Sequence, residues 1–366
     1  MRVLGLLVMM SVLATPLWAK PSAEDVFQRG MQLATMNDFD GAIREYTEAI
    51  RLKPDFANAF YHRGQSYAGK RDYDRAILDY SEALRLKPLC NGDAVSQNLM
   101  SGTITIAHTC ADYAAVLTAR GVAYFHKGDY SSAIRDHTEA IRFRPNDGYA
   151  FDFRGQVYAD KDDYARAIQD YTEAIRLQPR YSQAFSDRGT AYKNKGDYDL
   201  AIQDYTEVIR LRPQNENAFY NRGLTFKAKG DNDRAIQDYT QAIRINPYHG
   251  AALVSRGIVY KTKGDYDRAI QDYTEAIRVQ PDFAIALYNR GNAYSAKGDF
   301  DTAIRDYTEA IRLKPDYADA FNNRADAYKG KGDYEHARED YKRAMQLNPA
   351  WASEINKELE TMDKPR

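Results

Sequence analysis

The sequence has almost no net charge, only two cysteines, and no long apolar run beyond its first residues. Lys and Arg total 51 of the 366 residues and Asp and Glu total 52, so the formal net charge is -1. A nearly neutral chain has no overall attraction for nucleic acid or anionic membranes, and we expect neither as a partner. No second apolar segment of about 18 residues follows the N-terminus, so no membrane span is expected in the mature chain.

Recognisable catalytic and metal-binding motifs are also missing. The six histidines are scattered, without an HExxH arrangement or another pair at metal-ligand spacing. The glycines form no dinucleotide-binding, P-loop or nucleophile-elbow motif. Asp and Glu recur at the same positions of a motif that is copied along the chain. Such repetition is typical of solvated or helix-pairing positions rather than of an acid-base pair. The sequence therefore predicts a protein that is not an enzyme, without metal or cofactor.

Residues 1–19 have the pattern of a signal peptide. Arg2 is followed by an apolar run over residues 3–13, and a possible cleavage site follows Ala19. The pattern predicts export, which would place the mature protein in the periplasm or outside the cell. An uncleaved N-terminal anchor is the alternative, because Leu17 is an imperfect residue three positions before the cut.

One motif is copied along the rest of the chain. An Arg followed by Gly recurs every 34 residues, apart from one step of 57 residues, which indicates an insertion of 23 residues between the second and third copies. The high count of 29 tyrosines agrees with such copying. The copies are marked by Gly30, Gly64, Gly121, Gly155, Gly189, Gly223, Gly257 and Gly291, and Ala325 takes the same place in a ninth copy.

Each copy predicts two amphipathic helices joined by a tight turn. From Gln183 to Pro213, apolar residues recur at steps of three and four, which is the period of a helix. The turn at 195–198 supplies a Gly that ends the first helix in a left-handed conformation and an Asp that caps the second helix. A hairpin of about 34 residues is too small to bury its own apolar face, so neighbouring copies must stack.

The motif resembles the tetratricopeptide repeat over residues 23–351. The resemblance implies an all-α fold, a right-handed superhelical solenoid of about nine helical hairpins, to which the repeat spacing and the two cysteines add one disulfide-closed insertion. The chain would then consist of a signal peptide, repeats one and two, an insertion loop, repeats three to nine, and a capping helix with a tail, at 1–19, 20–90, 91–113, 114–351 and 352–366. In the second copy the residues that carry the resemblance are Phe60, Gly64, Tyr67, Ala76, Tyr80, Ala83 and Pro88.

One position departs from the tetratricopeptide pattern. The residue before the repeat Gly, usually Leu in the family, is Arg in every copy, and an acidic residue recurs sixteen positions later, as in Arg222 and Asp238. Because the pair is repeated, we expect it to join the two helices of each hairpin rather than to bind a ligand.

The insertion is bracketed by Cys90 and Cys110, the only cysteines. In an exported protein we expect them to form a disulfide, which would stabilise the fold by about 3 kcal/mol, and two buried thiols are the alternative. Within the insertion, residues 103–107 alternate polar and apolar side chains and are expected to be extended or a short strand. We hypothesise that the loop packs over an apolar face of the third repeat, formed by Ala115, Thr118, Ala119, Val122 and Phe125.

The first helices of the copies differ more than the second helices, and the resemblance implies that first helices line a ligand-binding groove. Three lysines one repeat apart predict a row of ammonium groups, and three asparagines at one shared position predict a carboxamide ladder like that of O-GlcNAc transferase. Ordinary surface positions are the alternative. The candidate groove residues are Tyr61, Lys193, Tyr220, Asn221, Leu224, Lys227, Ile258, Lys261, Tyr288, Asn289, Asn292 and Asn323.

These features predict an exported scaffold that binds an extended, partly acidic segment of another protein in its groove. The alternative is a self-associating structural component of the cell envelope, in which copies of the chain pair with one another.

Overall fold

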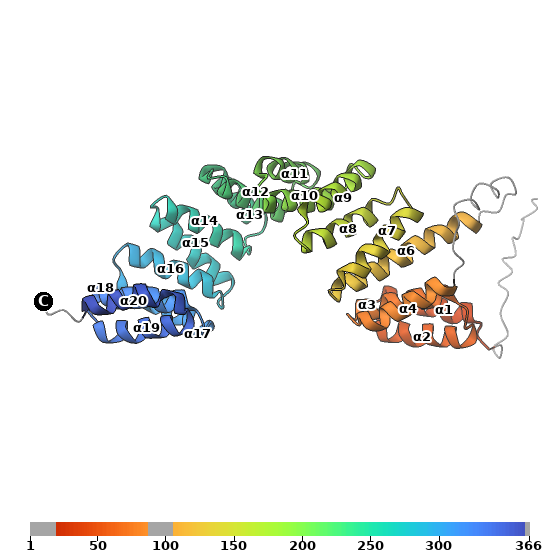
Figure 1. Ribbon diagram of the computed structural model, residues 1–366, viewed down its shortest axis with the longest axis horizontal. Helices are drawn as coiled ribbons and strands as arrows, with labels where there is room; N and C mark the ends of the chain where they lie inside the picture. Colours follow the sequence, from red (N-terminus) through yellow and green to blue (C-terminus); the bar gives the residue numbers. More distant parts are fainter. Residues whose placement is uncertain (1–19, 87–104, 363–366) are drawn as a thin grey trace, which may run out of the picture. The chain divides into compact units, whose positions relative to one another are not determined.

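The computed structural model describes residues 20–86 and 105–362, with only the backbone described for 105–112. Within these ranges every regular element is a helix, as predicted (Figure 1). The elements are α1 (Ala23–Thr35), α2 (Phe39–Leu52), α3 (Ala57–Gly69), α4 (Tyr73–Leu86), α6 (Thr105–His126), α7 (Tyr130–Phe143), α8 (Gly148–Asp160), α9 (Tyr164–Leu177), α10 (Ser182–Lys195), α11 (Tyr198–Leu211), α12 (Glu216–Ala228), α13 (Asn232–Ile245), α14 (Gly250–Thr262), α15 (Tyr266–Val279), α16 (Ala284–Ala296), α17 (Phe300–Leu313), α18 (Ala318–Lys331), α19 (Tyr334–Leu347), the 3-10 turn η1 (Pro349–Trp351) and α20 (Ala352–Met362).

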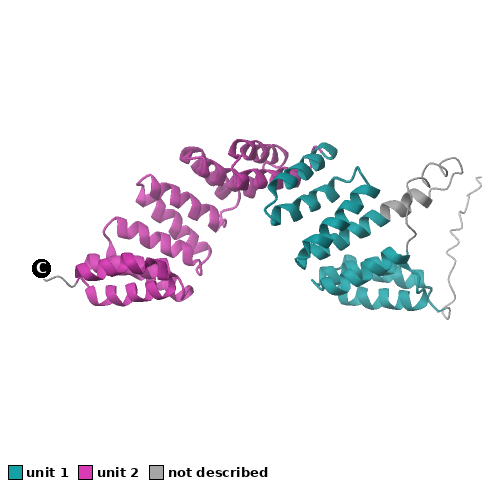
Figure 2. Cartoon of the chain, viewed as in Figure 1, with its two compact units in different colours: residues 1–178 teal, residues 179–366 magenta. Residues whose placement is uncertain are grey.

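The helices pair into nine successive hairpins, each made of a first and a second helix. The helices of a hairpin pack on each other, and the second helix also packs on the first helix of the next hairpin of the same unit, as α11 does on α12. The chain divides into two compact units (Figure 2), which are described separately below. Unit 1 ends at Gln178 and contains the first four hairpins, and unit 2 begins at Pro179 and contains the other five and α20.

The predicted turn chemistry holds only in part, because Gly196 adopts the expected conformation whereas the side chain of Asp197 accepts no hydrogen bond from the backbone of α11 in the described structure. Gly196 ends α10 in the left-handed conformation with φ 92°, which a side chain rarely adopts. In the preceding copy the same conformation is taken by Asp162, at φ 58°. Asp163 then caps α9, because its carboxylate accepts a hydrogen bond from the backbone N–H of Arg166.

The repeat Gly allows the two helices of a hairpin to approach closely. A Cβ atom on Gly223 would lie 2.8 Å from the ring of Tyr239, which is fully buried against it. Since atoms this close would clash, the small residue and the ring fit as a pair. The ninth copy combines Ala325 with a buried Tyr341, and the third copy replaces the tyrosine with His137.

The predicted Arg-to-acid pairs are confirmed. Arg222 of α12 donates two hydrogen bonds to Asp238 of α13, from Nε and Nη2 and both 2.8 Å long, and a third of 2.9 Å to Thr206 of α11. One guanidinium therefore joins three helices and two repeats. The corresponding pairs are Arg29 with Glu45, Arg63 with Asp79, Arg120 with Asp136, Arg154 with Asp170, Arg188 with Asp204, Arg256 with Asp272, Arg290 with Asp306, and Arg324 with Asp340.

The insertion is partly helical, so the extended conformation expected for residues 105–107 is wrong. Helix α6 begins at Thr105 and has 22 residues, against 13 or 14 in the other first helices of the hairpins. The remainder of the insertion, Cys90, the side chain of Cys110 and residues 1–19 lie outside what the structure describes. The disulfide, the packing of the loop and the signal peptide therefore remain predictions.

The last repeat is covered by α20, at the place where a capping helix was expected. Ile355 of α20 is only 2% exposed and lies in a cluster with Phe321, Tyr328 and Met345 of the ninth hairpin. None of the helices in the described ranges is long and apolar enough to cross a membrane.

Candidate functional site

Within unit 2, the first helices form the inner surface. First helices of neighbouring hairpins contact one another, as α10 does with α12 and α12 with α14, and second helices do not do so to the same extent. The side of the unit that carries the first helices is therefore the shorter, more crowded one. Side chains that flank the repeat Gly reach from one first helix to the next on this side, as the contacts below show.

The three candidate lysines, called the inner lysines below, are Lys193, Lys227 and Lys261. Each follows the repeat Gly by four residues and is partly exposed. In the described part of the chain none of their ammonium groups makes a hydrogen bond or an ion pair. Burial lowers the pKa of Lys193, and both burial and the charge of Lys227 lower the pKa of Lys261. The charges of Lys227 and Lys261, on successive first helices, therefore influence each other, and the row of three remains a prediction.

Lysines of the hairpin turns differ, because they are neutralised by acidic residues of the preceding repeat. Lys229 pairs with Asp199 and Lys263 with Asp233, both at 2.5 Å. Lys297 and Lys331 form the same contact with Asp267 and Asp301, and we call these four the turn lysines. In the described part of the second unit the turn lysines are therefore paired, whereas the ammonium groups of Lys193, Lys227 and Lys261 are not.

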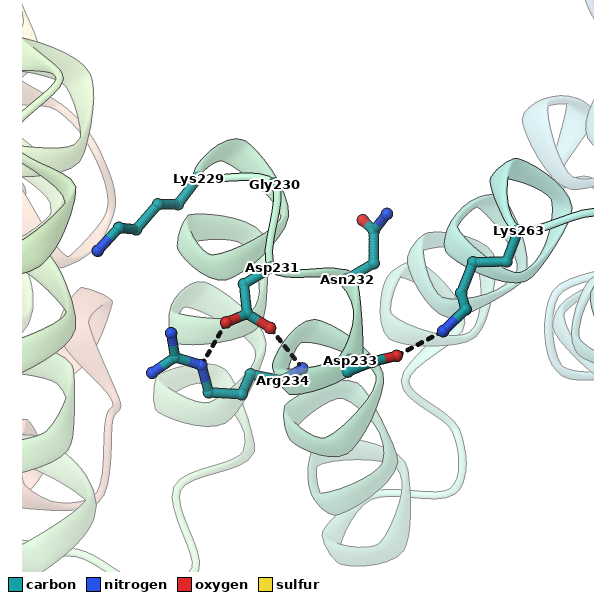
Figure 3. Close-up of a pocket in the computed structure, with 7 residues that line it drawn as sticks. All are labelled: Lys229, Gly230, Asp231, Asn232, Asp233, Arg234 and Lys263. Carbon is teal, nitrogen blue, oxygen red and sulfur yellow. Dashed lines mark hydrogen bonds and ion pairs between the residues drawn. The ribbon is translucent and has the colours of Figure 1, made fainter.

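A hollow of about 540 Å³ lies among these turns but is a weak candidate for a site (Figure 3). It occurs where Asn232 replaces the aromatic residue that begins the second helix in the other repeats. Figure 3 shows that Asp231 binds Arg234 and Asp233 binds Lys263. Lys229 pairs with Asp199 outside the hollow, so the charged side chains that line it all have partners.

The row of inner lysines ends at the eighth repeat. Ser295 takes the lysine position there, and the ninth repeat has Lys329. Lys329 differs from the inner lysines because it forms an ion pair with Glu358 of α20. Glu358 of the capping helix α20 thus neutralises Lys329, which occupies the same repeat position as the inner lysines.

Apolar side chains lie on the same first helices as the inner lysines. Tyr220 packs against the rings of Tyr239 and His249, with centroids 5.9 and 4.9 Å apart. Leu224 is partly buried in the same cluster as Tyr220, and Ile258 is partly buried in the cluster of the next repeat. The first helices of the sixth and seventh repeats therefore carry both an ammonium group and partly buried apolar side chains.

The asparagines do not form one continuous ladder. Asn289 is only 7% exposed and donates its side-chain amide to the carbonyl of Ile285 on its own helix, at 2.8 Å. Asn323 instead donates to Asn292, at 2.8 Å, and to the hydroxyl of Tyr288, at 3.0 Å. Asn221 has no side-chain hydrogen bond within the described ranges. The structure thus joins three of the candidates, Tyr288, Asn292 and Asn323, into a polar network between α16 and α18.

Unit 1 carries an apolar hollow of about 430 Å³, and Tyr61 is the candidate residue that lines it. The apolar face predicted for the third repeat forms one wall, except for Phe125. Sequence reasoning identified this face but not the hollow, which needs small residues on two helices at once. The residues that line the hollow on all sides are Tyr61, Gln65, Ala68, Tyr73, Tyr80, Ala115, Thr118, Ala119, Val122, Ala123, Asp147 and Phe153.

One buried histidine was missed because it was treated as one of six scattered residues. His137 is fully buried, stacks on Phe153 at 5.9 Å, and neither ring nitrogen has a partner in the described structure. Burial lowers its pKa to about 4. The sequence does distinguish this histidine, because the other eight copies of the repeat have Tyr at the position of His137. No group of three or more potential metal ligands occurs among the described residues.

Comparison with protein families identifies repeats along most of the chain. The family described as "TPR repeat" matches residues 155–196, 189–230, 257–298 and 291–332. Two families described as "Tetratricopeptide repeat" match residues 27–89 and residues 216–249 and 318–350. Together the matches cover well over half of the sequence. No curated protein matches it.

Solved structures of similar fold include two that are described as tetratricopeptide repeat proteins. The C-terminal part of a TPR repeat-containing protein from Cytophaga hutchinsonii is 21% identical, with a TM-score of 0.56 over 67% of this chain and 98% of that one. A tetratricopeptide repeat protein from Parabacteroides merdae is also 21% identical, with a TM-score of 0.52 over 69% and 99%. The Cut9-Hcn1 complex of the APC/C is 17% identical, with a TM-score of 0.51 over 94% and 84%. Such likeness concerns the fold, and together with the family matches it identifies the chain as a member of the tetratricopeptide repeat family.

Proposed function

We propose that this protein is an interaction scaffold that captures an extended, acidic segment of another protein on the inner surface of unit 2. The observation that carries the proposal is the unpaired state of the inner lysines within the described structure. Partly buried cations without a counter-charge are costly, and carboxylates of a partner would supply that charge. The paired turn lysines of the same unit indicate that the sequence neutralises lysines where no partner is needed.

The surroundings of the inner lysines favour a polypeptide over a polyanion such as nucleic acid. Tyr220, Leu224 and Ile258, on the same helices as two of these lysines, offer apolar contacts that a phosphate backbone would not use. The near-zero net charge of the whole chain also gives no long-range attraction for nucleic acid. A polypeptide with both acidic and apolar side chains fits this surface better.

The place of action is part of the proposal. The signal-peptide pattern of residues 1–19 supports a scaffold that works in the periplasm or outside the cell. N-terminal sequencing of the protein recovered from its native host tests it. We expect the mature chain to begin at Lys20, and an intact Met1 in the cytoplasmic fraction would contradict export.

The capture is tested by affinity purification from an envelope extract with three forms of the mature chain. One is the parent, one has Lys193, Lys227 and Lys261 all changed to Gln, and the matched control has Lys229, Lys263 and Lys297 changed to Gln. Both variants lose three positive charges from unit 2, so a difference between them reports position rather than net charge.

We expect a partner that the parent and the control retain and the inner-lysine variant loses. Its retention should fall as salt is raised, because the contacts are ionic. A partner held equally by all three forms would refute capture by the inner lysines. Recovery of a second copy of this chain instead would favour the self-association alternative, which light scattering of the purified protein would then establish.

A further inference from the structure

We infer that the segment captured by the inner lysines carries three acidic residues spaced at every third or fourth position, with apolar residues between them. This inference rests on the proposed function and adds the pattern by which the partner is recognised. It follows from the step between lysines, the ends of their row, and the apolar side chains one helical turn from two of them.

The step between lysines is set by the packing of the first helices. Lys193, Lys227 and Lys261 occupy the same position on α10, α12 and α14, and each of these helices contacts the next. Axes of packed helices lie about 8–10 Å apart. An extended chain advances about 3.3 Å per residue, so about three residues span one step. Because lysine side chains are flexible, a spacing of four residues in the partner also fits one step.

The length of the row limits the number of acidic residues. Ser295 follows the three inner lysines, and Lys329 beyond it is already paired with Glu358 of α20. The same pair illustrates the recognition, because the lysine of this position binds a carboxylate when a neighbouring helix offers one. A fourth acidic residue in the partner would meet Ser295 and gain no ion pair.

Apolar side chains one helical turn from two of the lysines favour apolar residues in the partner. Leu224 lies three residues before Lys227 on α12, and Ile258 lies three residues before Lys261 on α14. Both are only partly buried, so each retains apolar surface that a partner side chain would cover. A segment with acidic residues alone would leave this surface in water.

The pattern is tested with fluorescent peptides of identical composition, with binding to the mature chain followed by anisotropy. The spaced peptide has Glu at positions 1, 4 and 7 with Leu and Ser between them, and its isomer has three adjacent Glu. We expect the spaced peptide to bind at least tenfold more tightly than the isomer. A third peptide with a fourth Glu at position 10 should gain less than twofold.

The variants separate failure of the pattern from failure of the proposed function. Changing the inner lysines to Gln should abolish binding of the spaced peptide, and changing Lys229, Lys263 and Lys297 to Gln should not. If both isomers bind equally well and both depend on the inner lysines, acidic capture stands and the spacing is refuted. If no peptide binds, capture of acidic segments is itself refuted. Circular dichroism of each variant verifies that it is folded.

Discussion

Replacing Arg222 with Leu tests how the repeated Arg-to-Asp pairs hold the hairpins together. The side chains of Arg222 and Asp238 are 19% and 7% exposed, and two hydrogen bonds of 2.8 Å join them. Leu is the residue usual in the family at this position. The substitution leaves the carboxylate of Asp238 buried without its counter-charge and removes the third hydrogen bond, to Thr206.

The expected loss is about 3 kcal/mol in the free energy of unfolding, at the lower end for a broken buried pair because the guanidinium retains some contact with water. A second variant, Arg222→Leu with Asp238→Leu, removes both charges and refills part of the space. Since replacing a buried pair by apolar residues is often close to neutral, we expect it to recover at least two thirds of the loss.

Urea unfolding of the mature chain measures the total effect, and hydrogen exchange locates it. Because each repeat contacts only its neighbours, protection should fall first in α11, α12 and α13. A single variant within 0.5 kcal/mol of the parent would refute the stabilising role of the pair. A double variant as unstable as the single one would show that the loss comes from packing and not from an unpaired charge.

Two further perturbations test the core. Gly223→Ala should destabilise the protein by about 1–3 kcal/mol in thermal unfolding, because the added Cβ would lie 2.8 Å from the ring of Tyr239, and an unchanged Tm would contradict this close contact. Unfolded His137 binds a proton near pH 6.5 and the buried side chain only near pH 4, so stability should fall by roughly 3 kcal/mol as pH decreases across this interval. In His137→Tyr this part of the pH dependence should disappear in urea titrations, and its persistence would exclude His137 as the cause.

Comparison among copies within one sequence explains why the hairpins and the Arg-to-acid pairs could be predicted. The helical period is local, and the turn residues have conformations that depend on little beyond their own position. Arg222 and Asp238 lie on different helices, yet their constant separation in nine copies fixed them as partners. Repetition therefore supplied the long-range information that a single copy lacks.

Features that occur once had no such support. Thr105 and Ile106 have β-branched side chains, which favour a strand locally, and no second copy of the insertion exists for comparison. Their helix continues into the third repeat, so the helix that follows them overrides the local preference. The side chain of Asn289 likewise binds the carbonyl of Ile285 on its own helix. Asn221 has the same position in its repeat, but a shared position does not predict the side-chain conformation.

The position four residues after the repeat Gly shows how one fold provides two kinds of surface. In unit 1 this position holds Ala34, Ala68, Phe125 and Ala159, and in unit 2 it holds lysine in every repeat except at Ser295. The backbone is the same, so only the side chains decide the chemistry. Small side chains such as Ala68 help to leave the apolar hollow open in unit 1, whereas the inner lysines create an uncompensated positive surface in unit 2. A ligand held by unit 1 should therefore bind with little dependence on salt, and a ligand held by unit 2 should be released by it.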